Sequence, residues 1–258
     1  MKLVVFGTGN IATFYTERFA QAGIIPVQVI SRDEAKAKAF AEMYQCAYTT
    51  DPKHPDPDAD IYLLAFKDDA LISLASSLHL PGKLIVFPAG AIALSEFAHV
   101  SEHVACLWPL FSVRKEHLPV GKSIPVVVNA SNAEANEQAL KLAHLLTDAI
   151  FPLNDQQRSV AHLAAVFANN FTNHLYTLTQ AILKQEGIPF SLMLPIIQST
   201  TAKLLQGSPD QYQTGPAIRR DIKTISRHEE MLSGHADALA IYQIMTLAIQ
   251  SYYAEEGK

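Results

Sequence analysis

The first 150 residues alternate between short apolar runs and stretches in which apolar residues recur every three or four positions. The short runs are rich in Val, Ile, Leu and Phe, which favour strands. They lie at residues 1–6, 25–30, 46–49, 60–66, 83–87, 103–107, 124–129 and 149–152. The longer stretches predict helices at residues 11–22, 33–43, 68–78 and 132–147. This alternation is typical of a mostly parallel sheet covered by helices.

The pattern changes after Phe151-Pro152. Strand signals end there, and a helical pattern runs from Asp155 to Gln185, which is long for a globular helix. Further helices are predicted at residues 191–206, 216–232 and 235–254. We therefore predict two domains, an α/β domain over residues 1–152 and an all-helical domain over residues 153–258.

The first apolar run leads directly into Gly7-Thr8-Gly9-Asn10-Ile11-Ala12, a G-x-G-x-x-A turn. Gly7 permits the tight bend, Gly9 lets a pyrophosphate approach the backbone, and Ala12 lets the helix pack on the strand. The helix start then offers free N–H groups to an anion. With the run at 25–30 the turn completes a βαβ unit, so we predict a doubly wound Rossmann fold that binds a dinucleotide. A bare strand-to-helix turn is the alternative.

Two residues after the second strand indicate which dinucleotide is bound. Ser31 and Arg32 offer a hydroxyl and a forked guanidinium, and these suit the 2′-phosphate of NADP. Asp33 keeps NAD possible, because a carboxylate at this place can accept from the ribose hydroxyls. Alternatively, Ser31 and Glu34 form a helix capping box while Arg32 points to solvent. We predict NADP as the cofactor, with NAD possible.

Later strand ends add candidates around the same cofactor. Ala65, Phe66 and Asp68 follow the strand at 60–66, at the edge where open α/β sheets bind ligands. In the alternative interpretation Asp68 or Asp69 caps the next helix. Pro88-Ala89-Gly90 ends the next strand near the expected nicotinamide, and Trp108 either forms a wall of that pocket or belongs to the core.

Composition narrows the class of protein. The 258 residues are 49% hydrophobic and carry a formal charge of −5 without a basic stripe, so we expect a sizeable core and no nucleic-acid partner. Cys46 and Cys106 lack metal or redox spacing and are expected to be reduced thiols. No run is long enough to span a membrane and the start lacks a signal region, so we expect a cytoplasmic protein.

One metal-like motif is expected to be a coincidence. His99-Val100-Ser101-Glu102-His103 matches H-x-x-E-H, a pattern used by zinc peptidases, and that chemistry requires a helix. The segment falls in a turn that leads into a strand. We predict no metal site.

A polar stripe interrupts the long helical run. His162 lies seven and eight residues before Asn169 and Asn170, so a regular helix would place them on one face. Such a face can hydrogen-bond a carbonyl, imine or carboxylate and supply a proton from the imidazole. Alternatively the stripe is a buried polar seam between helices or at a dimer interface.

The segment Thr214-Gly215-Pro216 predicts the start of the helix at 216–232, with Pro216 in its first turn. Arg219 then lies in the first turn and can bind a carboxylate, or it forms a structural ion pair with Asp221 or with a partner elsewhere in the domain. His228, nine residues further on, would lie on the opposite side of that helix.

Together these motifs resemble the Rossmann-like proteins with a DUF2520 domain, a family related to pyrroline-5-carboxylate reductase and ketopantoate reductase in the 6-phosphogluconate dehydrogenase C-terminal-like superfamily. The resemblance spans the chain, and its carriers are Gly7–Ala12, Leu64–Leu71, Trp108–Leu110, His162–Phe171, Thr214–Asp221 and His228. It implies an NADP-binding oxidoreductase-like protein that forms a homodimer through the helical domain. The chain departs from the family pattern at Trp108, where His is common, and at Arg220, where Gly is usual.

We therefore predict an NADP-dependent reductase or dehydrogenase that acts on a small carbonyl, hydroxy acid or imine at the domain cleft. His162 with Asn169 or Asn170 would polarise the substrate, and Arg219 would anchor a carboxylate. Two alternatives are a non-catalytic NADP sensor or assembly protein and a vestigial turn that binds nothing. The first is motivated by Trp108 and by the lack of lysine between Asp155 and Leu183, where related hydroxyacid dehydrogenases place one.

Overall fold

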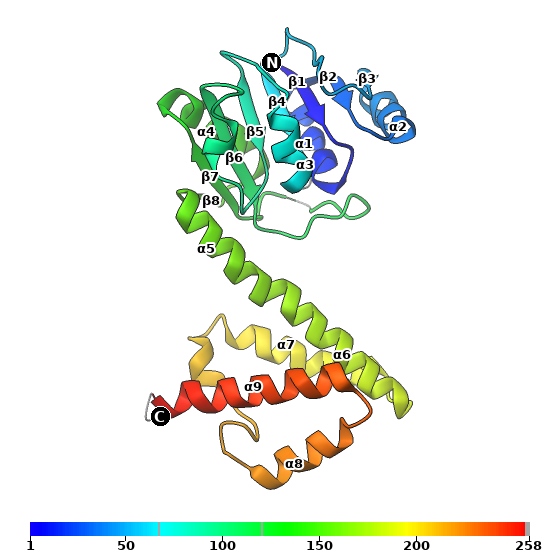
Figure 1. Ribbon diagram of the computed structural model, residues 1–258, viewed down its shortest axis with the longest axis vertical. Helices are drawn as coiled ribbons and strands as arrows, with labels where there is room; N and C mark the ends of the chain where they lie inside the picture. The colour runs from blue at the N-terminus through cyan, green and yellow to red at the C-terminus, as the bar shows by residue number, and fades with distance from the viewer. Residues whose placement is uncertain (67, 120, 256–258) are drawn as a thin grey trace. The chain divides into compact units, whose positions relative to one another are not determined.

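The computed structural model describes residues 1–66, 68–119 and 121–255 (Figure 1). Contacts divide the chain into two compact units, residues 1–168 and 169–258. The division falls inside the long helical run, whereas the sequence pattern suggests a boundary between residues 152 and 153. We describe each unit separately and refer to them as the Rossmann unit and the helical unit.

The Rossmann unit contains an eight-stranded sheet in the order β3-β2-β1-β4-β5-β6-β7-β8. All neighbouring strands pair in parallel except β6 and β7, which are antiparallel. The predicted mostly parallel, doubly wound sheet is confirmed. The strands are β1 (Lys2–Phe6), β2 (Ile25–Ile30), β3 (Ala47–Thr49), β4 (Ile61–Leu64), β5 (Leu84–Phe87), β6 (His103–Pro109), β7 (Val126–Ala130) and β8 (Ile150–Pro152).

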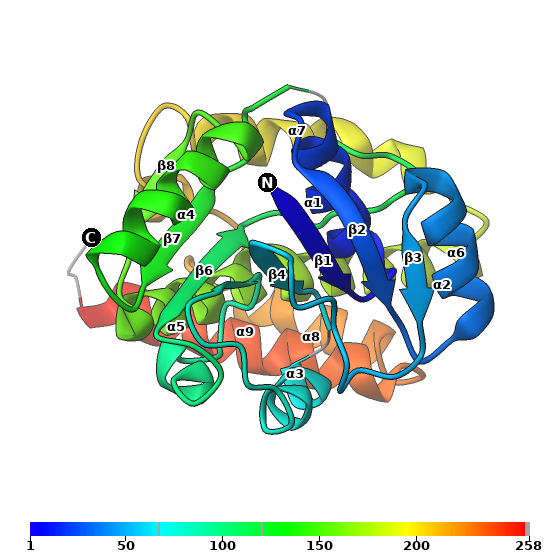
Figure 2. The ribbon, with the colours of Figure 1, turned by 90° about the horizontal axis from the view of Figure 1, so that it is seen from above.

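Helices cover both faces of this sheet, which explains why its strands are apolar on both sides. Alternate residues of β1 enter two separate cores: Leu3 and Val5 pack toward α1, α2 and α4, while Val4 and Phe6 pack toward α3. Figure 2 shows α1 and α4 on one side of the strands and α3 on the other. The helices are α1 (Asn10–Gln21), α2 (Glu34–Tyr44), α3 (Asp68–Ala75) and α4 (Ala133–Leu146), close to their predicted ranges.

The helix after β8, α5 (Asp155–Ala165), begins at a capping box formed by Asn154 and Gln157, beside strand β7. Asp155 lies beside Asn129, which pairs with Cys106 in the middle of β6. Further along α5, His162 reaches Trp108 near the carboxyl end of β6. The helix therefore runs in the direction of β6 and carries His162 to the edge of the sheet where β1 and β4 also end.

The predicted helix 155–185 is interrupted by a different hydrogen-bonding pattern. α5 is followed by a π-helix over Val166–Phe171 and then by α6 (Thr172–Gln185). A π-helix bonds residue i to i+5 and does not keep the 3.6-residue period. The spacing between His162 and the pair Asn169 and Asn170 therefore does not establish a shared face, and that part of the prediction rests on a wrong period.

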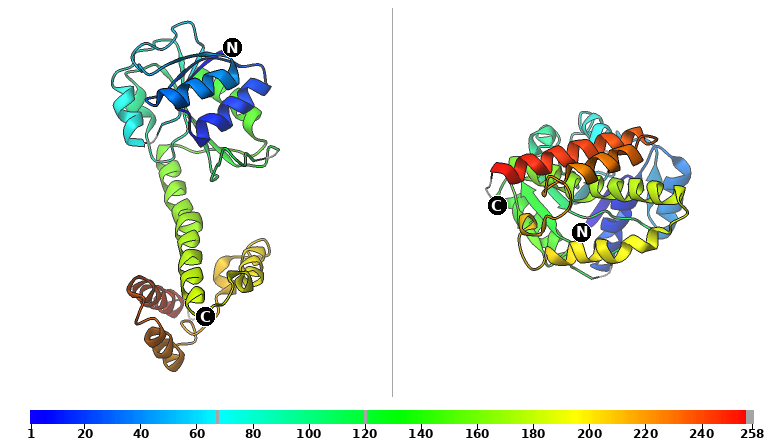
Figure 3. Two further views of the ribbon diagram at one scale, coloured as in Figure 1. Left: turned by 90° about the vertical axis from the view of Figure 1, so that its right-hand side faces the viewer. Right: turned by 90° about the horizontal axis from the view of Figure 1, so that it is seen from below.

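The helical unit is an open arrangement of α6, α7 (Leu194–Lys203), α8 (Ile222–Met231) and α9 (Ala236–Glu255). In Figure 3, α7 and α9 lie on opposite sides of α6. Two 3₁₀ turns precede and follow α7, at Phe190–Met193 and Pro209–Tyr212. Among the described residues of this unit only Ala217, Ile225, Leu232 and Ala238 are buried.

The predicted helix start at Thr214-Gly215-Pro216 is wrong. Pro216 opens a single turn, which ends where the Asp221 N–H donates to the Pro216 carbonyl and Arg220 adopts a left-handed φ of 52°. α8 begins only at Ile222, with Asp221 as its cap. Arg219 thus precedes the helix, so the predicted opposition of Arg219 and His228 around one helix axis does not apply.

Candidate functional site

The glycine turn lies at the carboxyl end of β1, between β2 and β4. Gly7 has a φ of +111°, and a Cβ placed on it would lie 2.5 Å from the Ala65 carbonyl oxygen. The Gly7 N–H also donates to Ile30, at 2.8 Å. Only glycine satisfies both the backbone angle and the close approach of the loop after β4, as the sequence pattern predicts.

The next glycine faces open space. Among the described residues, no atom lies within 4 Å of the position that a Cβ on Gly9 would occupy. Gly9 is the N-cap of α1, no described side chain caps this helix, and its first turn contains no acidic residue. The first N–H groups of α1 are therefore available to an anion, and the positive end of the helix dipole favours one.

A cavity of about 670 Å³ adjoins this turn. Cations outnumber carboxylates in its lining by three to one, so the cavity attracts a polyanion. The lining residues are Gly7, Thr8, Gly9, Asn10, Ser31, Arg32, Asp33, Lys36, Ala65, Phe66 and Lys115. The predicted Ile11 and Ala12 form the first turn of α1 behind this lining. Asp68 starts α3, and its side chain lies outside the described part of the structure.

Asp33, the residue that could bind the ribose hydroxyls of NAD, already makes two contacts with Lys36. Its carboxylate caps α2 by accepting from the Lys36 N–H at 3.1 Å, and it pairs with the Lys36 ammonium at 2.8 Å. These bonds, the one to the Lys36 side chain foremost, lower the pKa of Asp33. The alternative capping box of Ser31 and Glu34 is wrong, because the N-cap is Asp33. Arg32 is exposed and lines the cavity.

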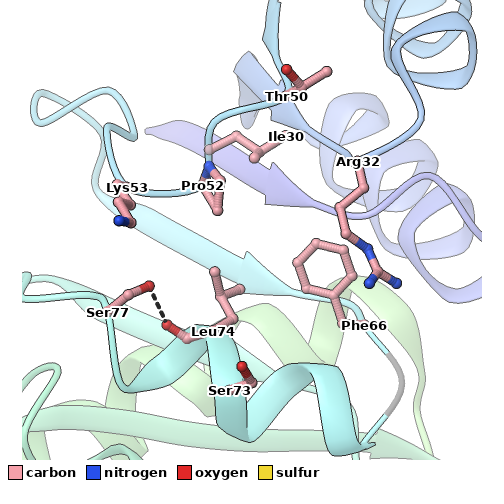
Figure 4. Close-up of a pocket in the computed structure, with 9 residues that line it drawn as sticks. All are labelled: Ile30, Arg32, Thr50, Pro52, Lys53, Phe66, Ser73, Leu74 and Ser77. Carbon is pink, nitrogen blue, oxygen red and sulfur yellow. Dashed lines mark hydrogen bonds between the residues drawn. The ribbon is translucent and has the colours of Figure 1, made fainter.

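Arg32 also borders a second cavity, of about 320 Å³, on the α3 side of β2 (Figure 4). Figure 4 shows the Arg32 side chain beside the Phe66 ring, with Ile30, Pro52 and Leu74 forming apolar walls. This combination of flat apolar walls and a cation at the rim suits an aromatic base that carries a phosphate nearby.

Besides Lys36, which pairs with Asp33, Lys115 is a lining residue that sequence reasoning missed. It lies in the connection between β6 and β7, and its N–H donates to Asn10 Oδ1 at 3.3 Å. The same connection is held to α1 by Arg18, which donates to the Pro119 and Gly121 carbonyls at 2.6 and 2.8 Å. The chain thus places a lysine beside the glycine turn from a segment about a hundred residues away in sequence.

His162 lies at the same carboxyl edge of the sheet, against the end of β5. Its Nδ1 lies 3.0 Å from the position of a Cβ built on Gly90, and the Trp108 indole lies 2.8 Å from that position. The Trp108 and His162 rings meet edge to face with centroids 5.6 Å apart. Trp108 is only 9% exposed, so it belongs to the core and also contacts His162. Within the described residues, neither ring nitrogen of His162 has a hydrogen-bond partner.

The remaining predicted catalytic residues belong to the helical unit. Asn169 and Asn170 lie in the π-helix and are exposed, and Arg219 is exposed in the turn before α8. His228 hydrogen-bonds the Tyr242 hydroxyl at 3.0 Å between α8 and α9. The roles of Asn169, Asn170 and Arg219 stay predictions.

Other sequence expectations have structural counterparts. The H-x-x-E-H segment forms a turn and the first residue of β6, and His99 bonds the Ala75 carbonyl. Cys106 is buried, Cys46 is half-buried, and burial raises the pKa of both thiols, that of Cys106 to about 12. In the part of the chain that the structure describes, no helix combines the length and apolar character required to cross a bilayer.

Comparison of the chain with known proteins identifies its family. Residues 2–89 match the family described as NADP oxidoreductase coenzyme F420-dependent, and residues 124–249 match the domain of unknown function DUF2520. The crystal structure of the "putative NADP oxidoreductase BF3122" of Bacteroides fragilis is 33% identical, aligns over 97% of this chain and 98% of its own, and has a TM-score of 0.87. This chain belongs to the DUF2520 family.

Two other solved structures share the fold of this DUF2520 protein at lower identity. The imine reductase of Myxococcus stipitatus, solved with NADP+, is 16% identical over 99% of this chain and 95% of its own, with a TM-score of 0.68. The 1-pyrroline-5-carboxylate reductase of Streptococcus pyogenes is 16% identical over 97% and 98%, with a TM-score of 0.58. No curated protein matches the DUF2520 chain. The predicted family and fold are confirmed, and NADP is the cofactor of the oxidoreductases to which they are related.

Proposed function

We propose that this protein is an NADPH-dependent reductase of a C=N or C=O bond in a small molecule, or the dehydrogenase of the corresponding hydroxy acid. The observation that carries the proposal is the nucleotide cradle. The start of α1 at Gly9 has no side-chain cap among the described residues, and Arg32 is exposed in the cradle while Asp33 pairs with Lys36. Imine and pyrroline carboxylate reductases with this fold support the substrate class.

The cradle fits the parts of NADPH in order. The pyrophosphate would meet the first N–H groups of α1 at Gly9 and Asn10, with Lys115 beside them. The adenine would enter the apolar cavity that Phe66 borders, and Arg32, which lines both cavities, would hold the 2′-phosphate. An NAD-type ribose contact would compete with the cap and the ion pair that Asp33 already makes.

The substrate end would lie beside Gly90, Trp108 and His162. When bound, NADPH supplies a hydride. The absence of a side chain on Gly90 keeps the backbone close to His162, whose ring nitrogens have no partner among the described residues. His162 would therefore hold and deliver the proton at the reduced nitrogen or oxygen. Asn169 or Asn170 would orient the substrate, and Arg219 would bind a carboxylate where the substrate has one.

We further propose a homodimer formed through the helical unit. α9 is mostly apolar and has no distinct polar face, and helices of that kind are normally buried, yet Ile244 and Leu247 are exposed. A second copy of the chain would cover them.

The unpaired thiols of Cys46 and Cys106 fit a reducing compartment, in line with a cytoplasmic location.

The cofactor part is tested by titrating NADPH and NADH into wild-type protein and Arg32→Gln, with Lys38→Gln in the neighbouring helix α2 as the control. Loss of the guanidinium should weaken NADPH binding by about 1.5–3 kcal/mol, or roughly 10- to 100-fold, and leave NADH binding unchanged. Equal affinities of the wild-type protein for both nucleotides would contradict the assignment of Arg32.

The chemical part is tested by NADPH oxidation with a panel of small ketones, cyclic imines and 2-oxo acids. His162→Gln should lower turnover about 10²- to 10⁴-fold at unchanged NADPH affinity. Full turnover in that variant would remove His162 from the mechanism. NADPH binding that changes the oligomeric state without oxidation of any panel member would instead favour a non-catalytic sensor.

A further inference from the structure

A buried arginine lies one turn before His162, and the proposed chemistry does not use it. Arg158 has no exposed surface. Its guanidinium lies over the Phe87 ring, 5.5 Å from the centroid, and its Nη2 pairs with Asp155 at 2.9 Å. A charge removed from water in this way is costly unless it is well paired.

The segment after β5, Pro88–Leu94, is attached to α5 at three successive places. Asp155 Oδ2 accepts from the Leu94 N–H at 3.0 Å, and Arg158 Nη2 donates to the Ile92 carbonyl. One turn later, Gly90 meets His162. Residues spaced three and four apart lie on one side of a helix, so a single face of α5 holds the whole segment.

The hydrogen bonding of the buried Arg158 guanidinium is incomplete among the described residues. One nitrogen, Nη2, makes both of its polar bonds, while Nε and Nη1 are buried without a hydrogen-bond partner in the described part of the chain. Buried donors left unpaired destabilise a fold, and an apolar side chain of similar size often does as well or better at such a place. This cost points to a role for the Nη2 bonds themselves.

We propose that Arg158 is a positioning residue: by holding Ile92 against α5 it keeps the Gly90 backbone in contact with His162. The inference rests on the proposed function, in which His162 holds the proton for the substrate. Without the bond to Ile92, the segment after β5 loses its central attachment, and His162 loses its fixed place beside Gly90 and Trp108. The nucleotide cradle at Gly9 involves none of these residues.

The test uses Trp108, the only tryptophan of the chain, as a reporter of the neighbouring imidazole. Trp108 emission is recorded as a function of pH, and comparison with His162→Gln defines the part of the change that is due to His162. Arg158→Lys, whose ammonium can make both Nη2 bonds, should retain the change. Arg158→Met should lose more than half of it, with NADPH affinity unaltered.

Turnover supplies a second readout with 2-methyl-1-pyrroline as the probe. Arg158→Met should lower kcat about 100-fold with little change in the NADPH KM, and Arg158→Lys should recover most of it. If Arg158→Met does not fold, as judged by circular dichroism, Arg158→Gln takes its place in both measurements.

Two outcomes separate this inference from the proposed function. A folded Arg158→Met or Arg158→Gln variant that keeps the full His162-dependent emission change would overturn the positioning role, even if NADPH is oxidised. Conversely, loss of that change, restored by lysine, in a protein that oxidises NADPH with no probe would uphold the positioning role and refute the reductase assignment.

Discussion

The two units of this chain differ in how much apolar surface they bury. In the Rossmann unit, strands such as Leu3–Phe6 are completely buried between two layers of helices. In the helical unit, α6 and α7 have no buried residue among those described, and Leu205 is 90% exposed. Helices draw most of their stability from tertiary packing. We therefore expect the first unit to fold by itself, and the proposed dimer would supply the surface that the second unit lacks.

The largest expected effect concerns the two units expressed separately. Residues 1–168 should show one cooperative thermal transition and bind NADPH, because the core and the nucleotide cradle are complete within them. Residues 169–258 should be mostly unfolded or aggregated at micromolar concentration. Circular dichroism and calorimetry measure both. A monomeric, cooperatively folded helical fragment would contradict the comparison.

Within the Rossmann unit, substitution of the two glycines of the turn should affect different properties of the protein. Gly7→Val should destabilise the protein by about 3 kcal/mol, because the side chain combines a strained φ with a clash against Ala65. Gly9→Val should lower the thermal midpoint much less than Gly7→Val, because only an N-cap preference is lost. It should weaken NADPH binding by at least about 1.5 kcal/mol, by occupying the phosphate space. Normal NADPH affinity in Gly9→Val would place the phosphates elsewhere.

The two units can be compared directly by introducing a glutamate at one exposed apolar position in each. Leu247 and Ile25 are 66% and 62% exposed, one in each unit. Leu247→Glu should dissociate the dimer, since an unpaired charge in an interface costs about 2–3 kcal/mol or more. Ile25→Glu should change stability by less than about 0.5 kcal/mol and leave the dimer intact. Sedimentation equilibrium distinguishes the two, and a wild-type monomer would refute the dimer.

A smaller effect is expected from Lys115, which reaches the cradle from the β6–β7 connection. Lys115→Gln should weaken NADPH and NADH equally, by about 1 kcal/mol, because an exposed lysine beside the pyrophosphate serves both nucleotides. Calorimetric titration against the control Lys122→Gln measures this. A loss confined to NADPH would move Lys115 to the 2′-phosphate.

The smallest expected effect is a gain in stability from a substitution in the helical unit, Arg220→Gly. Arg220 occupies a left-handed conformation, which costs a non-glycine residue about 1 kcal/mol. Arg220→Gly should therefore raise the thermal midpoint by a few degrees. Arg219→Gly, one position earlier, lacks this strain and should show no gain. A lower midpoint in Arg220→Gly would indicate that the arginine side chain makes a compensating contact.

The pattern of apolar residues in the sequence predicted the strands and the glycine turn of the Rossmann unit, and the reason is physical. Each strand is buried on both faces, so it appears as an uninterrupted apolar run, and the glycine turn imposes a backbone that few other residues adopt. The same reasoning failed at Thr214–Pro216, because a helix-start signature also fits an isolated turn. The family's usual glycine at position 220 was the available signal, since glycine there marks the end of a turn.

The site could be predicted only where its residues are close in sequence. Gly7 to Ala12 and Arg32 belong to one βαβ unit, so their spacing was informative. Lys115 and Arg158 were missed because charged residues on a loop and on a polar helix normally face solvent. Only the long-range contacts of Lys115 with Asn10 and of Arg158 with Ile92 reveal their places.

The π-helix at Val166–Phe171 has a consequence for insertions and deletions. Such a segment accommodates one residue more than a regular helix of the same length, so removing a single residue there would allow normal hydrogen bonding to resume. Every side chain of α6 would then turn by about 100° about the helix axis relative to α5. Natural relatives that lack one residue at this place are therefore expected to present different side chains of α6 to their substrates and partners.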